Sequence, residues 1–135
     1  MRPETPLLTV DSLIVYNSKI VLIKRKNPPY GWALPGGFVD IGETVEKAAA
    51  REAKEETGLN VKNLRLLGVY SDPERDKRGH SVSIAFYCEP EDCQIMPQGA
   101  DDALEAELFD FDHLPENIAF DHRKIIYDYL GIKNE

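Results

Sequence analysis

The sequence predicts one mixed α/β domain in which helices pack on the faces of a sheet. Segments with the composition of β-strands dominate the chain, and the two segments of helical character lie far apart from each other. Helices placed singly among strands are typical of a sheet covered on its faces. The 135 residues fit a single domain over residues 1–135, and 42% hydrophobic residues can form one core without a disulfide or metal.

The first two strands are predicted by runs of branched apolar residues on either side of a turn. Residues 7–16 (LLTVDSLIVY) and 19–24 (KIVLIK) both have this composition, and Asn17 and Ser18 between them are common turn residues. The two segments should therefore pair as a hairpin. Residues 26–32 (KNPPYGW) follow as irregular chain, because two prolines and a glycine break a regular ladder.

A helix over residues 43–57 (ETVEKAAAREAKEET) is the clearest regular element in the sequence. It is filled with alanines and long charged side chains, which favour helices, and Gly58 follows as a typical C-terminal stop. Residues 33–39 (ALPGGFV), just before it, form a short segment whose paired glycines permit a tight backbone.

The second half of the chain predicts further strands and one more helix. Residues 64–70, 81–89 and 106–112 have strand composition, and residues 71–80 form a polar loop between the first two of these strands. A final helix is expected over residues 120–130, where isoleucine, tyrosine and leucine recur on one side.

The balance of charges restricts the class of partner. The chain has 16 Lys and Arg against 24 Asp and Glu, which gives a formal net charge of −8. This charge disfavours binding to nucleic acid and to anionic membrane surfaces, because both need a positive field. It remains compatible with a phosphate-bearing small molecule, since local basic groups or a bound cation can outweigh the net charge.

Cysteine usage and the N-terminal sequence favour a cytoplasmic location. Cys88 and Cys93 fit no zinc-binding spacing and are expected to be reduced thiols. No apolar run approaches the roughly 20 residues of a membrane span. Residues 1–6 lack the apolar core of a secretory signal.

Three carboxylates are predicted to gather on one side of the first helix. Glu52, Glu55 and Glu56 fall within a stripe of about 100° on a helical wheel, on the side that begins with apolar residues. Arg51 and Lys54 are expected to lie to the sides of this stripe. Either some of the acids become neutral or a cation holds them, and hard oxygen ligands suit Mg²⁺ or Mn²⁺. The alternative is an acidic helix end exposed to solvent.

These acids belong to a longer motif. Gly37 is followed by five residues, Glu43, seven residues and then the run 51–59 (REAKEETGL). The pattern resembles the Nudix box, the signature of hydrolases of nucleoside diphosphates linked to another moiety, although Ala53 is small for its apolar position. The resemblance implies a Nudix-type α/β/α sandwich, with a mixed, curved sheet and helices on its faces.

The resemblance also implies a role for each residue of the box. The metal-binding acids are Glu52, Glu55 and Glu56. Gly36 and Gly37 match the tight loop ahead of the helix, where the carbonyl of Gly36 is expected to complete the metal shell. Glu43 and Arg51 match a pair that braces this loop against the helix, and we expect their side chains to be in contact.

Outside the box, the chain is similar to the ADP-ribose pyrophosphatases of this family. The similar stretches are residues 22–26, 32–40, 70–80, 100–106 and 120–122. Pro73 stands about where that subfamily has a proline. The resemblance implies Mg²⁺-dependent cleavage of ADP-ribose to AMP and ribose 5-phosphate by an activated water.

Other functions stay open at this point. The substrate could instead be NADH, an ADP-sugar, a dinucleoside polyphosphate or an oxidised deoxynucleoside triphosphate. A non-catalytic ADP-ribose sensor is a further alternative, although all four glutamates of the box are intact. Related ADP-ribose hydrolases are often homodimers, which leaves a homodimer open as well.

The remaining candidate residues serve proton transfer and substrate binding. The general base is left open among Glu52, Glu56, Asp101, Asp102 and Glu105. The predicted substrate contacts are Arg25 for phosphate, then Arg75 and Arg78, together with Gly37, Pro73 and Asp102. Trp32 and Tyr30 are candidates for stacking on adenine, with a place in the core as the alternative. His80, His113 and His122 share no metal spacing and are expected to be structural or at the surface.

Overall fold

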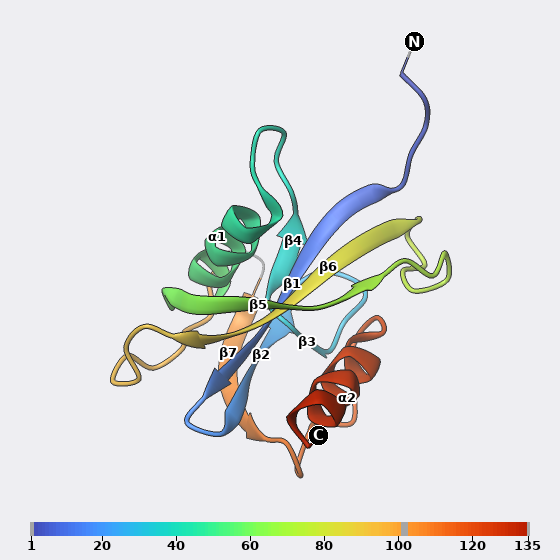
Figure 1. Cartoon of the computed structure of the whole chain (residues 1–135). Helices are drawn as coiled ribbons and strands as arrows, with labels where there is room; N and C mark the ends of the chain where they lie inside the picture. Colours follow the sequence, from blue (N-terminus) through green and yellow to red (C-terminus); the bar gives the residue numbers. More distant parts are fainter. Residues whose placement is uncertain (1, 101–102, 135) are drawn as a thin grey trace.

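The computed structural model describes residues 2–100 and 103–134. Its strands are β1 (Leu7–Tyr16), β2 (Lys19–Arg25), β3 (Trp32–Ala33), β4 (Gly36–Phe38), β5 (Val61–Tyr70), β6 (Ser81–Pro90) and β7 (Ala103–Asp110). Its helices are α1 (Val45–Thr57) and α2 (His122–Lys133). Figure 1 shows the two helices on opposite sides of the strands.

Strand β1 lies at the centre of a mixed sheet. It runs parallel to β6 and antiparallel to β4 and, at its end, to β2. Strand β5 extends the sheet beyond β6, while β2 continues it to β3 and β7. The predicted hairpin between β1 and β2 is confirmed, and Asn17 and Ser18 both have positive φ angles of 48° and 68°, as a tight hairpin turn requires. The predicted mixed sheet is therefore confirmed.

Alternate side chains of β1 supply the two faces of the sheet. Val10 and Ile14 pack on the side of α1, where Ala48 and Ala53 are buried. Leu13 packs on the opposite side, with residues of α2. This alternation has the period of two that a strand imposes, and it confirms the sandwich of a sheet between helices.

Helix α1 begins and ends at capping residues. The side chain of Thr44 accepts a hydrogen bond from the backbone N–H of Lys47, so the helix starts at Val45 rather than at the predicted Glu43. At the other end, Gly58 has a φ of 76°, which confirms the predicted glycine stop.

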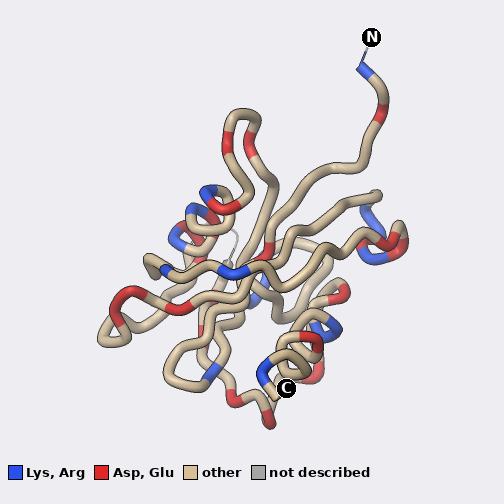
Figure 2. Tube along the Cα trace, viewed as in Figure 1, with Lys and Arg blue, Asp and Glu red and all other residues tan. Residues whose placement is uncertain are grey.

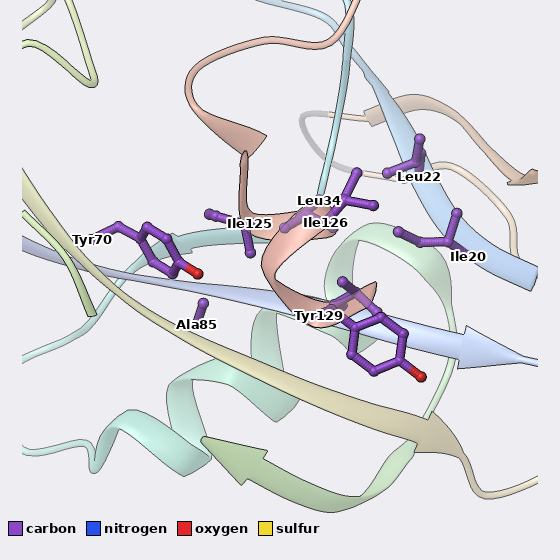
Figure 3. Close-up of a cluster of buried hydrophobic side chains, with 9 residues drawn as sticks. Ile20, Leu22, Leu34, Tyr70, Ala85, Ile125, Ile126 and Tyr129 are labelled. Carbon is purple, nitrogen blue, oxygen red and sulfur yellow. The ribbon is translucent and has the colours of Figure 1, made fainter. Parts of the chain in front are cut away.

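Helix α2 covers the main core of the molecule. Ile125, Ile126 and Tyr129 pack against Ile20 and Leu22 of β2, as Figure 3 shows. The helix starts at His122 rather than at the predicted residue 120, because Phe120 has a left-handed φ of 56° that a helix cannot continue through. It continues to Lys133, beyond the predicted end.

Pairing partners explain the other differences in strand boundaries. Strand β7 covers residues 103–110 rather than 106–112, because Lys19, the first residue of β2, pairs with Asp110. Strand β5 begins at Val61, which pairs with Pro90 at the end of β6. The predicted segment 33–39 is divided between β3 and β4.

Three further observations concern the surface charges, the thiols and the length of the helices. Acidic and basic residues alternate along α1 and in the loop between β5 and β6, as Figure 2 shows. Both cysteines are free, with Cys88 buried and Cys93 exposed. In the described part of the chain, neither helix has the length and apolar character needed to cross a bilayer.

Candidate active site

A cavity of about 230 Å³ lies where β1, the segment Gly36–Gly37, helix α1 and the start of α2 meet. Glu52 and Glu56 of α1 contribute to its lining. Three arginines line it as well: Arg25, Arg75 and Arg78. Acids that suit a cation and bases that suit phosphate therefore share one cavity.

The three predicted metal-binding acids differ in their surroundings. Glu56 is only 5% exposed, and its Oε1 accepts a hydrogen bond of 2.7 Å from the backbone N–H of Gly36. The side chain of Glu52 is 15% exposed, whereas that of Glu55 is 43% exposed and is not part of the described lining. The structure thus brings two of the three acids to the cavity.

Arg51 lies closer to these acids than the sequence predicts. Its Nη1 donates to Oε1 of Glu52 at 2.8 Å and to Oε2 of Glu55 at 3.2 Å. Arg51 was expected only to lie to the side of the acidic stripe, and the contact was not predicted because a helical wheel ignores how far an arginine side chain reaches. Among residues 2–100 and 103–134, no three His, Cys, Asp or Glu side chains are grouped closely enough to hold a metal.

Arg51 also makes the predicted contact with Glu43. Two hydrogen bonds join them, from Nε to Oε2 at 2.7 Å and from Nη2 to Oε1 at 2.8 Å. Arg51 further donates to the carbonyl of Phe38, and Glu43 accepts from the N–H of Asp40, so the pair connects the loop before α1 to the helix. Hydrogen bonding to Arg51 lowers the pKa of Glu43 to about 2, and the same contact raises the pKa of Arg51.

The two glycines permit a close approach of backbone and acids. A Cβ on Gly37 would lie 2.6 to 2.7 Å from the carboxylate of Glu52, which is too close for carbon and oxygen atoms that are not bonded. A Cβ on Gly36 would collide with the carbonyl of Val10 and with the side chain of Asp11. Both positions therefore exclude any larger residue without a shift of the site.

Arg25 and Arg78 flank one aromatic ring. Their guanidinium carbons lie 4.8 and 5.2 Å from the centre of the Phe120 ring, within range of cation–π attraction. Arg25 donates from Nε to the carbonyl of Pro29 at 2.7 Å. Arg78 forms a two-point contact with Asp76, which lowers the pKa of that carboxyl. Two cationic groups from distant segments are thus brought to the same side of the cavity.

Arg75 occupies a different position in the wall of the cavity. Its side chain is 4% exposed and donates to both carboxylate oxygens of Asp121, at 3.0 and 2.8 Å. It also donates to the hydroxyl of Ser81 at 2.8 Å. These contacts make Arg75 a buried brace between the loop and the start of α2, and the phosphate contact expected of it stays a prediction.

Several predicted residues lie away from the described lining of the cavity. Glu105 is exposed on β7 and pairs with Lys24 at 3.7 Å. Trp32 packs edge-on against Phe109, which agrees with the core alternative. Tyr30 and Pro73 are exposed, and neither is part of that lining. Asp101 and Asp102 fall outside the described residues.

Asp11 and His122 line the cavity, although the sequence predicted no role for either in the site. Asp11 is 6% exposed in the middle of β1, and Nε2 of His122 lies 3.3 Å from its Oδ1. The buried position of His122 agrees with the expected structural role, and the exposed His80 and His113 agree with a place at the surface. A signal for Asp11 was present in the sequence, since it is the one charged residue in a predicted strand of mostly apolar residues.

Comparison with a family model and with curated proteins points to the same family. A family model described as the NUDIX domain matches residues 6–129. Among curated proteins, the ADP-ribose pyrophosphatase of Methanocaldococcus jannaschii is 54% identical over 131 residues, which cover 96% of this chain and 76% of that protein.

Solved structures with this fold cover nearly the whole chain. A MutT NUDIX hydrolase from Burkholderia pseudomallei is 29% identical with a TM-score of 0.82, covering 93% of this chain and 98% of that one. The NUDIX domain of Shewanella oneidensis NrtR, complexed with ADP ribose, is 25% identical with a TM-score of 0.83, covering 97% of this chain and 90% of that one.

Proposed function

The chain belongs to the Nudix family and is a Nudix pyrophosphatase, and from this premise we propose that it hydrolyses ADP-ribose to AMP and ribose 5-phosphate. The observation that carries the proposal is the shared cavity, in which Glu52 and Glu56 lie with Arg25 and Arg78. A diphosphate between two sugars needs its charge neutralised and a water activated, and these residue types suit both tasks. The name of the archaeal relative and the ADP-ribose complex of a similar domain support this substrate.

The carboxylate oxygens are the donor type of a divalent metal of the hard class, and to hold one together Glu52 and Glu55 would exchange their contacts with Arg51 for the ion. Glu52, Glu55 and Glu56 are the proposed metal ligands, with the carbonyl of Gly36 as a fourth. Oxygen donors of this kind suit Mg²⁺ or Mn²⁺, and the absence of a side chain on Gly37 lets the carboxylate of Glu52 lie against the backbone of the glycine pair. When bound, the metal would supply positive charge against the diphosphate and lower the energy needed to deprotonate water.

The protein groups have distinct proposed tasks. Arg25 and Arg78 bind the phosphate oxygens, exchanging their present contacts with Pro29 and Asp76 for the substrate. Glu52 or Glu56 accepts the proton of the attacking water, and Asp101, Asp102 and Glu105 stay predictions for that role. Glu43 and Arg51 hold the loop in place. Adenine stacking on Trp32 or Tyr30 and the substrate contact at Pro73 also stay predictions.

Three broader expectations are part of the same proposal. The enzyme is proposed to act as a single Nudix domain over residues 1–135. It is proposed to work in the cytoplasm on a small molecule, with no nucleic-acid or membrane partner. A homodimer stays a prediction, to be measured by light scattering.

A substrate panel tests the proposal. ADP-ribose, NADH, an ADP-sugar, a diadenosine polyphosphate and 8-oxo-dGTP are incubated with Mg²⁺, and the products are separated by chromatography. The highest kcat/KM is expected for ADP-ribose, with AMP and ribose 5-phosphate released in equal amounts. A preparation that carries Glu52→Gln and Glu56→Gln controls for contaminating hydrolases. Tight binding of ADP-ribose without turnover would instead identify a sensor.

A further inference from the structure

His122 links the start of α2 to the segment before the glycine pair. Its ring is 3% exposed, and Nδ1 lies 3.0 Å from the backbone nitrogen of Leu34, which is 88 residues away in the sequence. Because a backbone N–H can only donate, Nδ1 must be the acceptor, and the proton of the neutral ring is on Nε2. Nε2 in turn faces Oδ1 of Asp11 at 3.3 Å.

Asp11 is itself held from several sides. The hydroxyl of Ser83 on β6 donates to its Oδ2, and Nη2 of Arg75 lies 3.7 Å from the same oxygen. In the sheet, Asp11 is the partner of Gly36 on β4. The histidine ring is therefore bonded at Nδ1, and its Nε2 lies 3.3 Å from a carboxylate that is buried next to the glycine pair.

The segment from Leu34 to Gly36 is held by a bond at each residue. The N–H of Leu34 donates to His122, and the carbonyl of Pro35 accepts from the N–H of Ser12 at 2.8 Å. The N–H of Gly36 donates to Oε1 of Glu56 at 2.7 Å. A shift at Leu34 would thus be passed over two residues to the carboxylate of Glu56.

Resting on the function proposed for this site, we propose that His122, oriented by Asp11, is a positioning residue that fixes the segment Leu34–Gly36 and thereby the carboxylate of Glu56. A buried imidazole and carboxylate lose their hydration, so a hydrophobic pair of similar volume would serve packing alone equally well. The pair of His122 and Asp11 additionally gives the backbone N–H of Leu34 a defined position. A displaced catalytic carboxylate lowers turnover more than it lowers substrate affinity, because the arginines that hold the phosphates lie on other segments.

Two substitutions separate the contacts of the ring. In His122→Asn the amide oxygen stands near the place of Nδ1 and can accept from Leu34, but the side chain does not reach Asp11. In His122→Gln the longer side chain can reach Asp11, but its amide lies beyond the N–H of Leu34. The exposed His113 provides the matched control, His113→Gln. Steady-state kinetics with ADP-ribose, amide hydrogen exchange and thermal unfolding are measured for each protein.

The proposal predicts that His122→Gln lowers kcat by about 10- to 100-fold with KM changed less than about threefold. The amide of Leu34 should exchange at least about tenfold faster in this variant, because it has lost its acceptor. His122→Asn should restore the slow exchange and keep kcat within about fivefold of the wild type. Equal loss of kcat in both variants, a loss confined to KM, or unchanged exchange at Leu34 would overturn the proposal.

A measurement on the unaltered protein keeps the test independent of variant folding. Long-range ¹H–¹⁵N correlation of the His122 ring should show a proton on Nε2 and none on Nδ1. A proton on Nδ1 would contradict the bond to Leu34 and overturn the proposal. If the unaltered protein hydrolyses no ADP-ribose, the proposed function fails, while the ring spectrum and the exchange at Leu34 still decide whether His122 holds this segment.

Discussion

Arg51 joins Glu43 by two hydrogen bonds, of 2.7 and 2.8 Å, across the junction between helix α1 and the loop before it. These bonds hold the pKa of Glu43 at about 2, against an ordinary value of 4.5. A lowered pKa in the folded state means that the contact stabilises the fold above about pH 4.5 and that this contribution is lost as the pH falls toward about 2. Glu43→Gln should therefore unfold at a lower temperature at neutral pH and show a flatter dependence over that acidic range.

Thermal unfolding followed by circular dichroism between these pH values checks this prediction. The exposed Glu91 offers a matched substitution, Glu91→Gln, which should leave the pH profile of the wild type intact. If the unfolding temperature of Glu43→Gln changed with pH in parallel with that of the wild type, the contact between Glu43 and Arg51 would not contribute to the pH dependence of stability.

The burial of the box glutamates predicts an order of effects on turnover. Glu52→Gln and Glu56→Gln, at the cavity, should lower kcat by about 100- to 1000-fold or more, since each removes a metal ligand or base. Glu55→Gln, at the more exposed position, should lower kcat less than either of these substitutions. Glu46→Gln on the exposed part of α1 should stay within about twofold, because surface substitutions away from such features have small effects. Near-normal turnover by Glu56→Gln would remove the proposed role of the acids.

Metal binding should be visible in thermal stability. We expect Mg²⁺ to bind the native carboxylates and not the unfolded chain, so it should raise the melting temperature and add about 2.7 kcal/mol of stability at 100 times Kd. The variant with both Glu52→Gln and Glu56→Gln should lose this shift. Scanning fluorimetry in MgCl₂, against NaCl of equal ionic strength, separates binding from screening. An equal shift in the double variant would place the metal elsewhere.

Substitution of glycine by alanine should have opposite effects at Gly37 and at Gly131. Gly37→Ala places a Cβ against the carboxylate of Glu52 and should reduce kcat by about tenfold or more, because that carboxylate must move. Gly131→Ala in α2 meets no atom within 4 Å and should stabilise the protein by about 0.5–1 kcal/mol without loss of activity. Denaturant unfolding and kinetics on both variants test the pair. Full activity in Gly37→Ala would mean that Glu52 can move without effect.

The arginines of the cavity should separate into binding and structural residues. Arg25→Ala and Arg78→Ala should each raise KM for ADP-ribose by about tenfold or more, because each removes a charged hydrogen bond. Arg75→Met should instead destabilise the protein by about 3 kcal/mol, since Asp121 and Asp11 lose their buried cation. Arg65→Ala, on the exposed surface of β5, is the control. An unchanged KM in Arg25→Ala would refute its role in phosphate binding.

The parts of the site that could be predicted from the sequence are local. The acids of α1, the glycines before it and the contact of Glu43 with Arg51 lie within one short stretch, where spacing fixes which groups can meet. The reach of Arg51 to Glu52 and Glu55 was missed, because a wheel places only the start of each side chain.

The parts that could not be predicted depend on segments far apart in the chain. Asp11 and His122 meet only because β1 and the start of α2 pack on the same face of the sheet. Arg25 and Arg78, from two other segments, both lie over the ring of Phe120. Glu105 lies beside Lys24 rather than in the cavity, because the register of β7 against β2 decides its place, and no local pattern encodes that register.

Strand β1 directs Asp11 toward His122 and the neighbouring Ser12 toward the carbonyl of Ala49 in α1. Since neighbouring side chains point to opposite faces, a slip of one residue would exchange these destinations. The carboxylate would then lie beneath the alanines of α1, and Val10 or Ser12, according to the direction of the slip, would face His122 and Arg75. The core and the cavity thus both depend on the same register of β1. A molecule in which β1 pairs one residue out of register would lose activity and stability together.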